Sequence, residues 1–174
     1  VILDGSASML AGDGVGGESR FEQARTAALD LVADLPGNAR MSLVLAGDPP
    51  QIVAAAEADP ERLRTALESA KAAPVEADWQ ATLALSSGAA SAPGLPSEGA
   101  EFILISDGGL TLETADRSGG TGALSDGLRL PGRLRYLPTG GQTGATQAAG
   151  TPNLAVSALA LRPAEPGVQL FAQV

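Results

Sequence analysis

Cysteine and histidine are both absent from the 174 residues of the chain. Without cysteine, the chain has no disulfide, no thiolate metal site and no thiol nucleophile. Without histidine, an imidazole base, a His-ligated zinc ion and a Ser-His-Asp relay are all excluded. The two absences together remove most of the common catalytic centres.

Basic residues are scarce, and so are long apolar runs. Lysine and arginine number 11 against 20 aspartates and glutamates, which gives a formal net charge of −9 and a sequence pI near 4.4. Such a charge opposes nucleic-acid binding, because phosphate neutralisation needs clustered basic side chains. No apolar run of about 18 residues is present to insert into a membrane, and no signal-peptide pattern is recognised.

What remains is the composition of a globular domain. Hydrophobic residues make up 44% of the chain and charged residues 18%, and the length suits one domain with one core. The 22 glycines and 12 prolines predict long ordered loops. Because the first expected strand begins at Val1 and the last is cut at Val174, we interpret the chain as a piece of a longer protein.

Apolar patterning predicts an alternation of strands and helices. Ser19 with Glu22, and Asp59 with Pro60, mark the starts of two helices. The alternation predicts an α/β fold, a doubly wound and mostly parallel sheet with helices on both faces. Strands are expected at 1–3, 41–47, 51–57 (an edge strand, because two prolines precede it), 102–106 and 134–138, and helices at 19–35, 60–70 and 78–92.

The C-terminal part has a different pattern. Residues 154–161 and 168–174 are expected to form a β-hairpin with its turn at 164–167. We therefore divide the chain into an α/β domain at residues 1–150 and a hairpin at residues 151–174, which is a candidate start of a second β module.

Two aspartates follow strands of the predicted sheet. Asp4 ends the apolar run 1–3, and Asp107 follows the run 102–106. In open α/β sheets, ligands collect at the carboxyl ends of the strands. If the two strands are neighbours, the carboxylates face each other across one crevice, where like charges are unfavourable unless a cation lies between them.

Two serines come directly after the first of these aspartates. Ser6 and Ser8 alternate along a segment that we expect to be extended, so both hydroxyls should point the same way. Hydroxyl and carboxylate oxygens are the ligands of a hard cation such as Mg²⁺. The simpler interpretation is that the aspartates cap loops and the serines make turn hydrogen bonds.

The segment "DGSAS" resembles the D-x-S-x-S motif of the metal-ion-dependent adhesion site in von Willebrand factor type A domains, and "FILISDGG" resembles a later strand of that family with its aspartate. The resemblance extends over about residues 1–138 and is greatest to the bacterial subgroup related to the aerotolerance proteins. It implies that Ser6 and Ser8 bind the metal directly, while Asp4 and Asp107 act largely through waters or hydrogen bonds.

One position departs from the family pattern. A threonine normally completes the set, and this chain has Ala77 there, followed by Asp78. Three interpretations stay open: Asp78 substitutes as a ligand, water fills that corner, or the site is degenerate. Asp78 is also a candidate N-cap of its helix.

Other patterns indicate less. Trp79 is expected to pack at the start of the third helix rather than to anchor a partner. The glycines of "GDGVGG" match a dinucleotide-binding pattern, but that pattern must follow the first strand directly, and "DGSASMLA" intervenes.

The resemblance implies a non-enzymatic adhesion module in which Mg²⁺, or Mn²⁺ or Ca²⁺, accepts an Asp or Glu side chain of a protein partner. The alternative is a structural scaffold with a degenerate metal site that interacts through the C-terminal hairpin. A metal-assisted hydrolase is disfavoured because no general base is evident. The acidic charge and the resemblance favour the extracytoplasmic face of a membrane-anchored bacterial protein.

Overall fold

The structure, a computed structural model, describes residues 1–91, 100–108, 121–123, 129–140, 158–164 and 167–173. Its elements are β1 (Ile2–Asp4), the 3-10 helices η1 (Ala7–Leu10) and η2 (Val15–Gly17), α1 (Arg20–Ala33), β2 (Met41–Ala46), β3 (Gln51–Glu57), α2 (Pro60–Ser69), α3 (Trp79–Ala90), β4 (Glu101–Ser106), β5 (Thr121–Ala123), β6 (Arg129–Pro138), β7 (Ala158–Ala164) and β8 (Gly167–Gln173).

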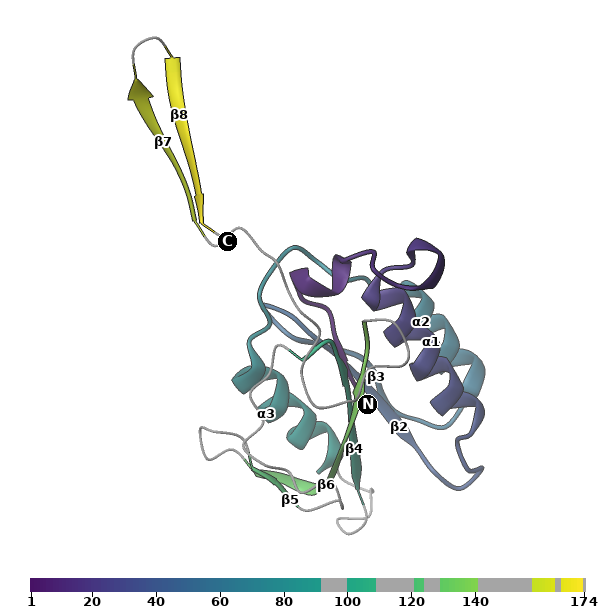
Figure 1. The fold of residues 1–174 in the computed structure, drawn as a ribbon. Coiled ribbons are helices and arrows are strands. Elements are labelled where there is room, and N and C mark those ends of the chain that lie inside the picture. Colours follow the sequence, from purple (N-terminus) through teal and green to yellow (C-terminus); the bar gives the residue numbers. More distant parts are fainter. Residues whose placement is uncertain (92–99, 109–120, 124–128, 141–157, 165–166, 174) are drawn as a thin grey trace.

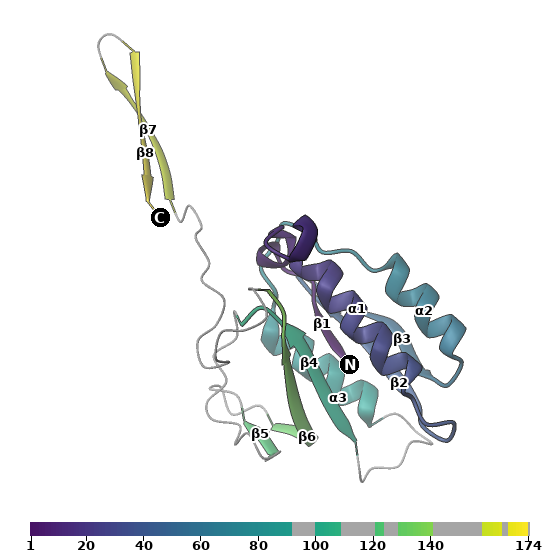
Figure 2. The same ribbon diagram turned by 45° about the vertical axis from the view of Figure 1, so that its right-hand side comes forward.

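Strands β1 to β6 form one mixed sheet in the order β3-β2-β1-β4-β6-β5 (Figures 1 and 2). The four central strands are parallel, and the two edge strands, β3 and β5, run antiparallel to their neighbours. This confirms the mostly parallel α/β fold and the edge position of β3. The short strand β1 lies in the middle of the sheet, and all three of its residues are buried.

Helices cover both faces of the sheet, as the pattern predicts. Helices α1 and α2 lie on one face and α3 lies on the other (Figure 2). The two faces have separate apolar clusters because successive strand residues point to opposite sides. Alternate residues of β1 and β4 accordingly divide between the clusters: Leu3, Ile103 and Ile105 pack with α1 and α2, and Ile2, Phe102 and Leu104 pack with α3.

The helix starts are those that the sequence indicates. The Ser19 hydroxyl accepts a hydrogen bond from the Glu22 amide, and the Asp59 carboxylate accepts one from the Glu61 amide. On α1, the residues Phe21, Ala24, Ala28 and Val32 are buried, and their spacing of three and four places them on one face of the helix. None of the helices in the described ranges is long and apolar enough to cross a membrane.

The strands after β4 differ in part from those that the sequence predicts. Strand β6 is longer than the expected run 134–138, and β5, which pairs with it, was not expected. Strands β7 and β8 form an antiparallel hairpin, in which Ala164 pairs with Gly167 at the turn and Ala158 pairs with Gln173. The expected residues 154–157 and 174 of the hairpin lie outside the described residues.

Candidate functional site

The two central strands β1 and β4 bring Asp4 and Asp107 to the same edge of the sheet. Leu3 pairs with Ile105 in the parallel register, so Asp4 and Ser106 come next on the two strands and Asp107 follows. The strands are therefore neighbours, which is the condition that the sequence argument required. Asp4 is 1% exposed and Asp107 is 3% exposed.

Asp4 holds the start of the loop that follows β1. Its Oδ1 accepts a hydrogen bond from the Ser6 amide at 2.9 Å, and its Oδ2 accepts one from the Ser106 hydroxyl at 2.6 Å. Hydrogen-bond donors at these distances replace the hydration that a carboxylate loses on burial. The Asp4 carboxylate thus joins β1, its own loop and the end of β4.

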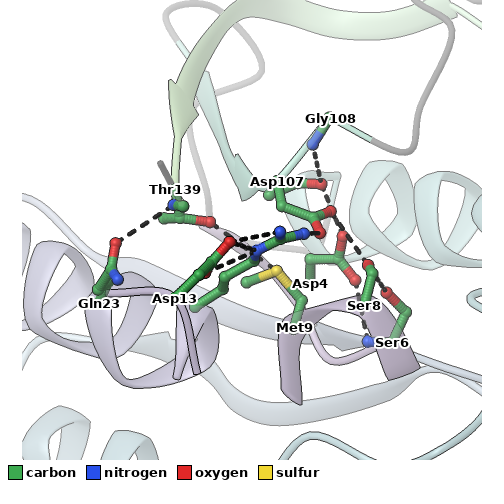
Figure 3. Close-up of polar contacts among 12 residues, drawn as sticks. Asp4, Ser6, Ser8, Met9, Asp13, Gln23, Asp107, Gly108 and Thr139 are labelled. Atoms are coloured by element: carbon green, nitrogen blue, oxygen red, sulfur yellow. Dashed lines mark hydrogen bonds and ion pairs between the residues drawn. The ribbon is translucent and has the colours of Figure 1, made fainter. Parts of the chain in front are cut away.

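The hydroxyls of Ser6 and Ser8 converge at this edge (Figure 3). The two Oγ atoms lie 3.2 Å apart, and the Ser8 hydroxyl donates to Oδ1 of Asp107 at 3.1 Å. The expected extended segment is wrong, because Ser8 lies in the 3-10 helix η1 and only Ser6 has extended backbone angles. The tight turn brings the hydroxyls together, since a 3-10 helix lets the chain change direction within one turn.

Gly5 allows this loop to lie against β2. Its amide donates to the Ala46 carbonyl oxygen at 3.0 Å. A Cβ at residue 5 would lie 2.7 Å from that oxygen and 2.9 Å from Cδ1 of Leu45. Only glycine therefore fits between the carboxylate and the first hydroxyl without moving the chain.

Arg20, the first residue of α1, is a member of the site that the sequence analysis missed. Its Nη1 lies 2.6 Å from Oδ2 of Asp107, and its Nε and Nη2 contact the Asp13 carboxylate at 3.0 and 2.6 Å. Arg20 is 3% exposed, whereas the Asp13 side chain is 39% exposed. The guanidinium therefore joins the loop before α1 to the end of β4.

The ion pairs shift the protonation equilibria of both partners. The hydrogen bonds from Arg20 hold the pKa of Asp13 below its ordinary value. In return, the Asp13 hydrogen bond, with a further contribution from Asp107, raises the pKa of Arg20 despite its burial. Both groups are charged near neutral pH, because Arg is protonated and Asp is ionised there.

Asp78 does not join the other four predicted residues. It is the N-cap of α3: its Oδ1 accepts from the Ala81 amide at 2.9 Å, and its side chain is exposed. The loop before α3 is nevertheless close to residues 5–8, which carry the two serines and are called the serine loop below, because the Ala7 amide donates to the Val75 carbonyl at 2.8 Å. Ala77, at the position where the family pattern has threonine, provides no side-chain oxygen.

The end of β6 completes the surroundings of the site. Tyr136 donates its hydroxyl to the Ser106 carbonyl at 2.9 Å. The buried Thr139 hydroxyl lies 3.8 Å from the sulfur of Met9, which is on η1, and the Gly140 amide donates to the Gln23 side chain at 3.2 Å. The contacts of Thr139 and Gly140 connect η1 and α1 to the end of β6 (Figure 3).

The chemistry of the converging groups is that of an oxygen site. Within the described residues, no three Asp or Glu side chains cluster as a carboxylate site would. The hydroxyl oxygens of Ser6 and Ser8 converge instead, with the Asp107 carboxylate hydrogen-bonded to Ser8 and the Asp4 carboxylate supporting the loop. A donor set of this kind fits a hard divalent cation such as Mg²⁺, which commonly retains several waters.

Comparison with solved structures shows the fold. The chain is similar to the conserved hypothetical protein BatB from Bacteroides thetaiotaomicron, with a TM-score of 0.53 and 23% identity over 62% of this chain and 52% of that one. The chain therefore spans about half the length of that protein. It is also similar to an aerotolerance-related membrane protein from Bacteroides fragilis NCTC 9343, with a TM-score of 0.58 and 22% identity over 98% of this chain and 79% of that one.

Comparison of sequences shows the family. No curated protein matches the chain. The family model described as von Willebrand factor type A domain matches residues 1–109, which include the four residues that meet at the sheet edge. Over most of its length, from β1 to the end of β4, the chain belongs to the family of von Willebrand factor type A domains.

Proposed function

We propose that this domain is a non-enzymatic protein-interaction module that binds an acidic side chain of a partner through a divalent cation. Ser6 and Ser8 would hold the cation directly. Asp107 would orient Ser8 through its hydrogen bond, and Asp4 would keep the serine loop in place. The partner would contribute an Asp or Glu carboxylate as the last ligand.

The observation that supports this proposal most directly is the 3.2 Å separation of the two serine hydroxyls beside the Asp107 carboxylate. Neutral hydroxyl ligands, with carboxylates acting mainly through hydrogen bonds, leave a bound Mg²⁺ electron-poor and able to accept one more anionic oxygen. Membership of the von Willebrand factor type A family supports a protein as the partner.

Calorimetric titration of the domain with Mg²⁺ and with Mn²⁺ tests the metal part of the proposal. We expect binding in the micromolar to millimolar range, and its loss in Ser6→Ala and Ser8→Ala without loss of the fold. Ser69→Ala is the matched control, because Ser69 is an exposed serine at the end of α2. Unchanged binding in both loop variants would contradict the assignment of the serines as ligands.

A second candidate function is a structural scaffold with a degenerate site. Two observations favour it: Ala77 offers no donor, and the Asp78 carboxylate caps its own helix instead of joining the serines. In that case the β7–β8 hairpin is the interaction element, because unpaired strand edges can pair with a neighbouring strand. No heat of binding with either cation would favour this candidate over the first.

We further propose that the domain belongs to a membrane-anchored bacterial protein and faces outward from the cytoplasm. The similarity of the fold to the Bacteroides fragilis membrane protein supports this location. Protease accessibility of the full-length protein in spheroplasts, which lack a closed outer membrane but keep the inner membrane intact, tests it. Digestion of this domain only after the inner membrane is opened would contradict the outward orientation.

A further inference from the structure

The site contains a positive charge of its own. Arg20 is buried, and its guanidinium contacts both Asp107, beside the serine hydroxyls, and Asp13, at the rim. A cation-binding site with a built-in guanidinium is an unusual combination, because like charges repel in a poorly solvated environment. The following inference rests on the proposed function of the same site.

Four charged residues determine the electrostatic potential of the site. Asp4 and Asp107 are both buried, so together they attract a cation strongly. Arg20 offsets part of that attraction, since its Nη1 is 2.6 Å from Oδ2 of Asp107. Asp13 in turn offsets Arg20, with its carboxylate oxygen 2.6 Å from Nη2. Asp107, Arg20 and Asp13 thus form a chain of three alternating charges that ends at the exposed rim.

The second oxygen of Asp107 contacts the serine loop. Its Oδ1 accepts from Ser8, while Oδ2 is occupied by Arg20. A guanidinium on one carboxylate oxygen draws electron density from the other, so the Asp107 carboxylate is a weaker partner for a cation than it would be alone. Arg20 therefore affects the donor set without itself being a donor.

We propose that Arg20 is an internal counter-ion that lowers the affinity of this site for a divalent cation, and that Asp13 limits this effect by neutralising Arg20. The pair makes occupancy of the site responsive to cation concentration instead of permanent. It also keeps the loop before α1 joined to the end of β4 before any cation binds, because the Arg20 contacts are present in the chain itself. Arg20 and Asp13 are thus positioning and charge-tuning residues, not ligands.

The competing explanation is that Arg20 and Asp13 only fasten the start of α1 to the sheet. The two explanations predict different directions of change in cation affinity. If the pair is a fastener, breaking it from either side loosens the loop, and both variants change cation binding in the same direction. If the charges tune the site, removal of Arg20 tightens cation binding and removal of Asp13 weakens it.

The experiment measures Mg²⁺ affinity by calorimetry, and the Mg²⁺-induced rise in melting temperature, for wild type, Arg20→Gln, Arg20→Lys and Asp13→Asn. We expect Arg20→Gln to bind Mg²⁺ at least about tenfold more tightly, a change that corresponds to ~1.4 kcal/mol. Asp13→Asn should bind several-fold more weakly. Arg20→Lys keeps the charge and should remain nearer to wild type than Arg20→Gln.

Asp30→Asn is the matched control, because Asp30 is an exposed carboxylate on α1 and its loss changes the net charge equally. Unfolding in chelator shows which variants fold. If Arg20→Gln does not fold, Arg20→Lys and Asp13→Asn decide together, because lysine keeps the charge but loses the two-point contact with Asp13. Binding near wild type in Arg20→Lys, with weaker binding in Asp13→Asn than in Asp30→Asn, supports the inference. Weaker binding in both Arg20→Lys and Asp13→Asn, or binding in Asp13→Asn equal to that in Asp30→Asn, overturns it.

The outcomes separate this inference from the proposed function. Opposite shifts in Arg20→Gln and Asp13→Asn support the inference, whereas unchanged affinities or shifts of the same sign overturn it. If wild type does not bind Mg²⁺ but Arg20→Gln does, the inference holds and the metal-dependent function of the native domain fails. If neither protein binds Mg²⁺, both fail.

Discussion

The Ser106 hydroxyl donates a 2.6 Å hydrogen bond to Oδ2 of Asp4, across the two central strands β4 and β1. Ser106 is 0% exposed and Asp4 is 1% exposed, so neither group can turn to water instead. This contact, between residues 102 positions apart in the sequence, connects the last residue of β4 to the carboxylate that holds the serine loop.

Ser106→Ala should therefore destabilise the domain more than an ordinary serine deletion. Loss of a donor to a buried charged group costs about 1.5–3 kcal/mol. The control is Ser86→Ala, since buried Ser86 donates only to the neutral Thr82 carbonyl within α3. Urea unfolding in chelator measures both, and an equal loss in the two variants would contradict a charged Asp4 as the acceptor.

The Asp13 carboxylate predicts a specific pH dependence of stability. Because Arg20 holds its folded-state pKa below the ordinary value, Asp13 stabilises the fold fully above about pH 5, and this contribution disappears as pH falls through the lowered pKa. Asp13→Asn should thus lose stability near neutral pH and show a shallower decline in acid.

Thermal unfolding at a series of pH values in chelator measures this effect. Asp30→Asn serves as the comparison, because it removes a carboxylate of the same type that is exposed on α1. A decline in acid that is equally steep in wild type and Asp13→Asn would show that the Arg20 contact does not govern the titration of Asp13.

Asp78 should act as a helix cap. Asp78→Ala is expected to cost about 1 kcal/mol of stability, and Asp78→Asn much less, because asparagine also accepts the amide hydrogen bond. Calorimetry on Asp78→Asn adds the second readout: we expect Mg²⁺ affinity close to that of wild type. A loss of affinity of more than about tenfold, or ~1.4 kcal/mol, would instead identify Asp78 as a ligand.

Tyr136 provides a spectroscopic measure of the charges in the site, since it is the single tyrosine of the chain. Partial burial, together with the charges of Asp107 and Asp4, raises the pKa of Tyr136 to about 12, although 36% of the residue is exposed. The folded state therefore retains the phenolic proton longer than the unfolded chain, which titrates near pH 10. Stability is unaffected below about pH 10 and falls between the two values.

Ultraviolet absorbance of phenolate in chelator checks this value, with Tyr136→Phe as the baseline. Asp107→Asn should move the titration to lower pH, because one of the two negative charges is gone. A tyrosine that titrates near pH 10 while the protein is still folded would contradict the raised pKa and the hydrogen bond from the Tyr136 hydroxyl to the Ser106 carbonyl.

Most of the fold could be predicted from the sequence, because its signals are local. The apolar run at β4, the caps Ser19 and Asp59, and the spacing of buried residues on α1 each fix an element by themselves. The alternation of strands and helices then leaves few topologies. Strand β5 has only three residues and no alternation, so no local signal distinguished it from a loop.

The candidate site was predicted less completely. Asp4 and Asp107 could be found because strand ends converge on one edge, but Ser106 reads as the end of an apolar run. The position of Arg20 gives one indication of its role: a basic residue at the first position of a helix opposes the helix dipole, and a nearby anion compensates for it. The anions are Asp13 and Asp107, and these tertiary contacts are not specified by any spacing in the sequence.

The arrangement of the oxygen atoms in the site depends on Gly5, although Gly5 contributes no side-chain oxygen itself. Its amide lies against the Ala46 carbonyl, where an added methyl group would be 2.7 Å from the oxygen. In Gly5→Ala, that methyl would act as a wedge between the loop and β2, while every oxygen of the original set stays in the chain. A single methyl group would therefore displace the oxygen atoms of the site without removing any of them.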